Sequence, residues 1–90
     1  MWGGGSVLVL VRIMVETPRL EQVVDALRRM PEVIDLFEVT GEHDLVALVE
    51  VEDVSKFREL LVGRILKVEG IRGTDSSIVL YVHKRGGEEF

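Results

Sequence analysis

Hydrophobic positions divide the chain into four apolar runs and two amphipathic segments. The first run, residues 7–15, is almost continuously apolar and β-branched, which is typical of a strand buried on both faces. Residues 33–39 and 45–51 flank a short loop that contains one glycine, and together they predict a β-hairpin. The last run, from about residue 75 to 83, predicts a final strand.

The two amphipathic segments predict helices. Residues 17–31 begin with a Thr-Pro pair, read as an N-cap followed by proline at the first helical position, and end at a second proline. Residues 53–70 begin with aspartate, a preferred N-cap, and end at a glycine suited to left-handed geometry. Gly63 lies inside this helix and weakens it by up to about 1 kcal/mol relative to alanine, which suggests a role in close packing.

This order of elements predicts an α+β fold of the ferredoxin-like βαββαβ type. Its four-stranded antiparallel sheet carries both helices on one face. The first and last strands are apolar on both sides, so the bare face would expose a patch larger than monomers usually tolerate. We therefore expect a homodimer with facing sheets, a dimeric α/β barrel. Residues 7–84 form the domain, between a flexible leader (1–6) and a flexible tail (85–90).

Composition narrows the function classes. The chain has 90 residues, 47% of them apolar, and a mean hydropathy of +0.24, so self-association is a natural way to bury the surplus. A net charge of −5 argues against unaided nucleic-acid binding, which needs basic side chains. The absence of cysteine excludes disulfides and thiolate sites. No run approaches the roughly 20 residues of a membrane span, and no signal peptide is evident, so we expect a cytoplasmic protein without membrane contact.

The predicted hairpin loop concentrates polar chemistry. Gly41 can adopt positive φ, and Asp44 can bond its own backbone. Backbone N–H groups near Gly41 can hold a carboxylate, while Glu42 or Asp44 can hold an ammonium group, a combination that suits an amino acid. The alternative is that Gly41 and Asp44 only close the hairpin.

Other polar residues carry weaker signals. Thr74 and Ser76 share one side of an extended chain, where their hydroxyls either bind a ligand or bond the backbone. His43 and His83 have no partners at metal-ligand spacing, so we interpret them as solvent-exposed imidazoles and expect no metal site, cofactor or catalytic residue. Arg12, the charge within the first apolar run, is expected to reach the strand edge or an ion pair with a carboxylate.

Four short motifs together resemble the effector-binding (RAM) domain of the Lrp/AsnC family of bacterial and archaeal regulators. They are Pro31-Glu32-Val33, the turn Val39-Thr40-Gly41-Glu42-His43-Asp44, Glu69-Gly70-Ile71, and Thr74-Asp75-Ser76-Ser77-Ile78-Val79-Leu80. Each motif is weak alone, but their order covers residues 7 to about 82.

The resemblance implies ferredoxin-like dimers with facing sheets, commonly assembled into octameric rings. It also implies a small effector, typically an amino acid, bound in clefts between dimers. The residues implicated by the motif match are Thr40, Gly41, Glu42, His43 and Asp44, with Thr74 and Ser76 opposite them. Ser76 stands where the family usually has a second threonine.

Most family members also carry an N-terminal helix-turn-helix domain, for which 90 residues leave no room. The chain thus resembles a stand-alone effector module that acts through another protein, such as a full-length Lrp/AsnC-type regulator.

Three functions are compatible with the sequence. The first is a non-enzymatic module that binds an amino acid and oligomerises in transcription regulation. The second is a dimeric α/β-barrel enzyme that handles heme or a quinol, which would need polar or histidine side chains between sheet and helices. The third is a structural assembly partner of full-length regulators with no ligand response.

Overall fold

The computed structural model describes residues 5–90, so residues 1–4 of the predicted leader lie outside the described part. The main sheet contains β1 (Val7–Val15), β2 (Val33–Glu38), β3 (Leu45–Val51) and β4 (Ile71–Ile78), in the order β2-β3-β1-β4. The helical elements are η1 (Thr17–Arg19), α1 (Leu20–Arg28), α2 (Val54–Gly63) and η2 (Ile65–Lys67). A separate hairpin is formed by β5 (Lys84–Arg85) and β6 (Glu88–Glu89).

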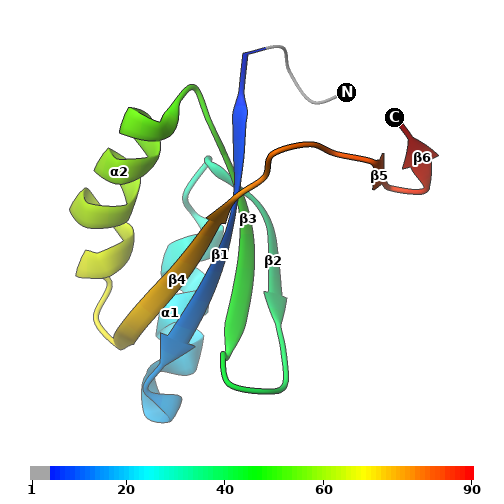
Figure 1. Ribbon diagram of the computed structural model, residues 1–90. Helices are drawn as coiled ribbons and strands as arrows, with labels where there is room; N and C mark the ends of the chain where they lie inside the picture. The colour runs from blue at the N-terminus through cyan, green and yellow to red at the C-terminus, as the bar shows by residue number, and fades with distance from the viewer. Residues whose placement is uncertain (1–4) are drawn as a thin grey trace.

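All pairings in the main sheet are antiparallel, and α1 and α2 cover the same face of the sheet (Figure 1). The predicted ferredoxin-like arrangement is therefore confirmed. Among residues 5–90, no helix combines the length and apolar character needed to cross a membrane.

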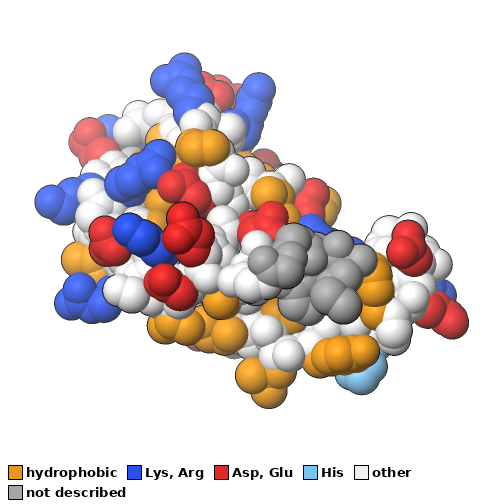
Figure 2. All heavy atoms as spheres, turned by 90° about the horizontal axis from the view of Figure 1, so that it is seen from above, with side chains coloured by type: hydrophobic (Ala, Val, Ile, Leu, Met, Phe, Trp, Pro, Cys, Tyr) orange, Lys and Arg blue, Asp and Glu red, His pale blue; other side chains and the backbone are white. Residues whose placement is uncertain are grey.

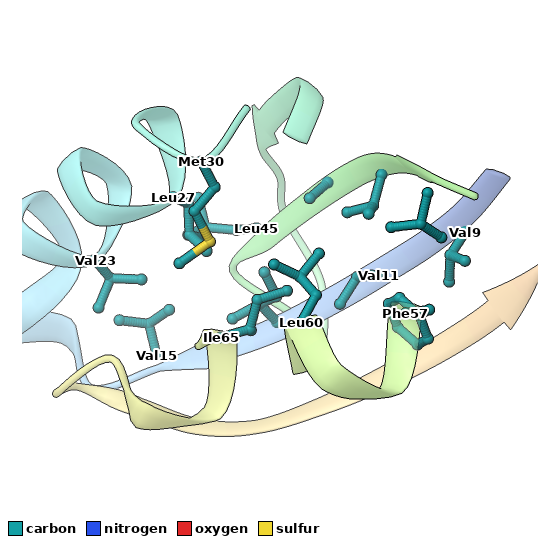
Figure 3. Packing of buried hydrophobic residues seen from close by; sticks show 14 residues of the cluster. Val9, Val11, Val15, Val23, Leu27, Met30, Leu45, Phe57, Leu60 and Ile65 are labelled. Carbon is teal, nitrogen blue, oxygen red and sulfur yellow. The ribbon is translucent and has the colours of Figure 1, made fainter. Parts of the chain in front are cut away.

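The core lies between this sheet and the two helices (Figure 3). Val9, Val11 and Ile13 are fully buried beneath the helices, and Leu27 and Ile65 meet them from the helical layer. The residues between them on β1 point to the opposite face and are only partly covered. Burial of β1 on both faces is thus not achieved within one chain, because a single helical layer covers one side.

The uncovered side of the sheet is called the open face below. The strand register places twelve residues on it: Leu8, Leu10, Arg12, Met14, Asp35, Phe37, Val46, Leu48, Glu50, Gly73, Asp75 and Ser77. Half of them are large apolar side chains, of which Leu8 is buried and Phe37 is 57% exposed. One chain alone therefore leaves several large apolar side chains of this face partly exposed to water, among charged and polar ones.

The helix starts differ in how well the sequence predicted them. Asp53 caps α2 as expected, since its Oδ1 accepts a hydrogen bond from the Lys56 N–H at 2.8 Å. Thr17 as N-cap of the first helix is wrong. Thr17 and Pro18 lie in the tight η1 turn, which the Arg19 N–H closes onto the Glu16 carbonyl at 2.8 Å. Proline suits this turn because it needs no N–H donor there.

The two helix-associated glycines behave oppositely. Gly70 has φ +105°, and a Cβ built on it would lie 2.6 Å from Cβ of Arg19. Glycine is therefore required where the turn after η2 packs against the start of α1. At Gly63, a built Cβ meets nothing within 4 Å, so the suggested role in close packing within the chain is wrong.

The C-terminal boundaries also differ from the prediction. The last strand was expected at residues 75–83, but β4 spans Ile71–Ile78. Its partner β1 begins at Val7, and the bond from the Val79 N–H to the Leu8 carbonyl, at 2.9 Å, lies at that end. After this bond the chain leaves the sheet, and the apolar residues that follow Val79 do not pair with β1.

Candidate functional site

The loop between β2 and β3 is attached to the end of β1 through Asp44. The Asp44 N–H donates to the Ile13 carbonyl at 2.9 Å, and Asp44 Oδ2 accepts from the Val15 N–H at 2.7 Å. The Val39 N–H donates to the Asp44 carbonyl at 2.9 Å and closes the loop. One carboxylate oxygen of Asp44 is thus bonded to the backbone of its own chain.

The remaining loop residues are presented outward. Thr40, Gly41 and Glu42 are exposed, and His43 is half-buried. Gly41 has φ +109°, and the space around its missing Cβ is empty to 4 Å. Open backbone therefore lies at the tip of a loop whose base is anchored by Asp44.

Thr74 and Ser76 lie on the edge strand β4, opposite Ile13 and Val11 of β1. Residues in register share a face, so both hydroxyls lie on the helix-bearing side at the sheet edge. Thr74 is half-buried and Ser76 is exposed. Ile13 also pairs with Leu45, so Thr74 and the loop occupy the same end of the sheet, two strands or roughly 10 Å apart.

The seven predicted ligand-binding residues lie outside two surface grooves formed by residues 5–90. The grooves measure about 610 and 510 Å³, and none of the seven lines either one. The larger lies between the end of β3 and α2, where Arg64 Nη1 contacts both carboxylate oxygens of Glu32 at 3.0 and 3.1 Å. Figure 2 looks down on this end, with acidic and basic side chains side by side.

The interior offers no acid–base chemistry. Within the described residues, the buried side chains are all apolar, and no group of three or more His, Asp or Glu side chains is placed to hold a metal ion. His43 is half-buried, and His83 stacks edge-on against Tyr81 with ring centroids 4.8 Å apart. A reaction in the space between sheet and helices would lack a general acid or base from this part of the chain.

A polar cluster that the sequence only half predicted lies on the open face. Arg12 Nε contacts Asp75 Oδ2 at 3.2 Å, and its Nη2 donates to Ser77 Oγ at 2.7 Å. The expected ion pair of Arg12 is confirmed. Asp75 and Ser77 were missed as its partners, although their i, i+2 spacing places both on one side of a strand.

Comparison with known proteins identifies the family. The family model described as the Lrp/AsnC ligand binding domain matches residues 8–89. An uncharacterized HTH-type transcriptional regulator of Pyrococcus abyssi is 35% identical over 83 residues, covering 92% of this chain and 52% of the regulator. The chain thus spans about half the length of this curated relative.

Two solved structures show the same fold. The protein TTHA0845 of Thermus thermophilus has a TM-score of 0.82 at 29% identity, covering 88% of this chain and 99% of that one. The transcriptional regulator NMB0573 of Neisseria meningitidis, solved as a complex with L-Met, has a TM-score of 0.85 at 24% identity, covering 91% and 55%. With the family match over nearly its whole length, the chain belongs to the Lrp/AsnC ligand-binding domain family.

Proposed function

We propose that this chain is a non-enzymatic effector module of transcription regulation that binds an amino acid and self-associates in the cytoplasm. The observation that carries the proposal is the anchored loop, in which Asp44 fixes the base and Gly41 presents open backbone at the tip. A rigid loop with exposed N–H groups suits a ligand carboxylate, since little ordering is needed on binding.

The proposal gives the two carboxylates of the loop different roles. Asp44 already accepts the Val15 N–H, whereas Glu42 is exposed and forms no ion pair among the described residues. Glu42 is therefore the better candidate to hold an ammonium group. The L-Met complex of the Neisseria regulator supports an amino acid as the ligand class.

Completion of the site requires another subunit. The loop and Thr74 lie at one end of the sheet without a common pocket, so a neighbouring copy would have to close the cleft. The ligand would then stabilise the assembly in proportion to its preference for the assembled state. Full-length Lrp/AsnC-type regulators are the natural partners through which such a module would reach DNA, given that the relatives are HTH-type regulators.

The test is a calorimetric titration of the protein with each standard amino acid at concentrations up to millimolar. We expect binding of one chemical class, weakened at least tenfold by Glu42→Gln because a charge-assisted contact is lost. Glu52→Gln, at the opposite end of β3, is the matched control and should bind normally. Absence of binding by every amino acid would overturn the sensing role.

A further inference from the structure

The last twelve residues of the chain, residues 79–90, are called the C-terminal arm here. The arm leaves the sheet after the bond from the Val79 N–H to the Leu8 carbonyl. It then runs away from both helices and ends in the β5–β6 hairpin, which stands apart from the main body (Figure 1). The hairpin turns at Gly86-Gly87, with φ of +59° and +81°, and the Phe90 N–H donates to the His83 carbonyl at 3.0 Å.

The arm exposes large apolar side chains. Leu80 is 93% exposed, Tyr81 59% and Phe90 39%. A two-stranded hairpin is at best marginally stable in water alone, and a small protein rarely projects apolar side chains without a partner surface. In Figure 2, hydrophobic side chains along the lower margin continue towards the projection.

We propose that the arm packs against a second copy of this chain. Leu80 and Tyr81 would contact the partner beside its open face. This inference rests on the self-association included in the proposed function, and it names the segment that secures the contact. The arm projects on the side of the sheet that the helices leave bare, so whatever covers the open face also meets the arm.

The combined size of the open face and the arm is that of a stable interface with a second copy of the chain. A stable protein interface takes about 20–30 residues from each side. The outward-facing positions of the four strands supply only about a dozen, and the arm supplies a similar number. The sheet and the arm together therefore reach the size that neither reaches alone.

The charges on the arm and the open face fit a twofold contact. An isologous interface must be complementary to itself, so any charge on it needs an opposite charge on the same surface. The hairpin pairs Lys84 with Glu89 and Arg85 with Glu88 across its strands, and the open face carries Arg12 beside Asp75. The hairpin is balanced in charge, and the open face carries both signs, with Asp35 and Glu50 as further carboxylates.

The first test measures dimer dissociation by sedimentation velocity over a dilution series. Leu80→Asp should raise the dissociation constant at least about tenfold, because a buried leucine is replaced by a charge. Its 93% exposure means that the substitution leaves the folded monomer intact, which circular dichroism checks. The control is Leu66→Asp, the same change at a 45% exposed position in η2 on the helical side, which should dissociate like the wild type.

A second measurement locates the arm directly. With photoreactive benzoylphenylalanine in place of Tyr81, irradiation should yield a covalent dimer. A wild-type dimer that Leu80→Asp leaves unchanged, with crosslinks only within one chain, would overturn the arm contact and leave self-association standing. A wild-type protein that is monomeric at every concentration would overturn both.

Discussion

The side chain of Asp44 accepts a hydrogen bond from the backbone N–H of Val15 at 2.7 Å, which joins the β2–β3 loop to the last residue of β1. The two residues lie 29 positions apart in the chain. This bond gives the loop a fixed base, and it occupies one of the two carboxylate oxygens of Asp44. A residue that the sequence offered either for ligand binding or for closing the hairpin therefore has a structural role in the loop.

Asp44→Ala should lower the free energy of unfolding by about 1–3 kcal/mol, because the Val15 N–H loses a charged acceptor. Asp44→Asn keeps an oxygen at the same place and should lose less. Urea denaturation of the two variants measures the difference. Glu42→Ala, in the exposed part of the loop, is the control and should change stability by less than about 0.5 kcal/mol. Equal stability of Asp44→Ala and the wild type would contradict the anchoring role.

The two helix-associated glycines should respond oppositely to alanine. Gly70→Ala should destabilise the fold by more than about 1 kcal/mol, since it combines a φ of +105° with a Cβ 2.6 Å from that of Arg19. Gly63→Ala meets open space and should be neutral or stabilising by up to about 1 kcal/mol. Thermal unfolding of the Gly70→Ala and Gly63→Ala variants measures both changes in stability. A harmful Gly63→Ala in the monomer would mean that the packing around α2 is tighter than described.

The Arg12–Asp75 pair should matter to association far more than to monomer folding. In one chain the pair is partly exposed, with Asp75 60% accessible, and such pairs contribute about 0–1 kcal/mol. If a second copy covers the open face, Asp75→Ala leaves a buried guanidinium without its carboxylate, a costly arrangement. We expect the dissociation constant of the dimer to rise at least tenfold, as measured by sedimentation velocity.

The matched control is Asp25→Ala, which removes an ion pair with Arg28 on the outer surface of α1. It should leave association unchanged. Equal effects of Asp75→Ala and Asp25→Ala would show that the open face remains in water.

The fold followed from the sequence wherever pattern and turn signals agreed. The hairpin around Gly41 and the capping of α2 by Asp53 are local features, and both were predicted. The end of β4 was wrong because the apolar run continues through Val82, whereas the last residue of β4 to pair with β1 is Ile78, opposite Val9. The C-terminal hairpin was missed, although the Gly86-Gly87 pair is a known signal for a two-residue turn.

The candidate site was less accessible to sequence reasoning. The sequence grouped Thr74 and Ser76 with the loop, and the register places Thr74 at the same end of the sheet. No pattern along the chain could show that Asp44 is bonded to Val15, because that contact depends on the docking of two strands. A pocket shared between subunits is likewise invisible in the sequence of one chain.

The central claim, an amino-acid-responsive module that self-associates, is tested most directly by light scattering of the pure protein with and without each amino acid. Melting temperature is recorded on the same samples. The account predicts a dimer or a larger ring whose mass or melting temperature shifts with one class of amino acid. A monomer, or an assembly that responds to none of them, would contradict it.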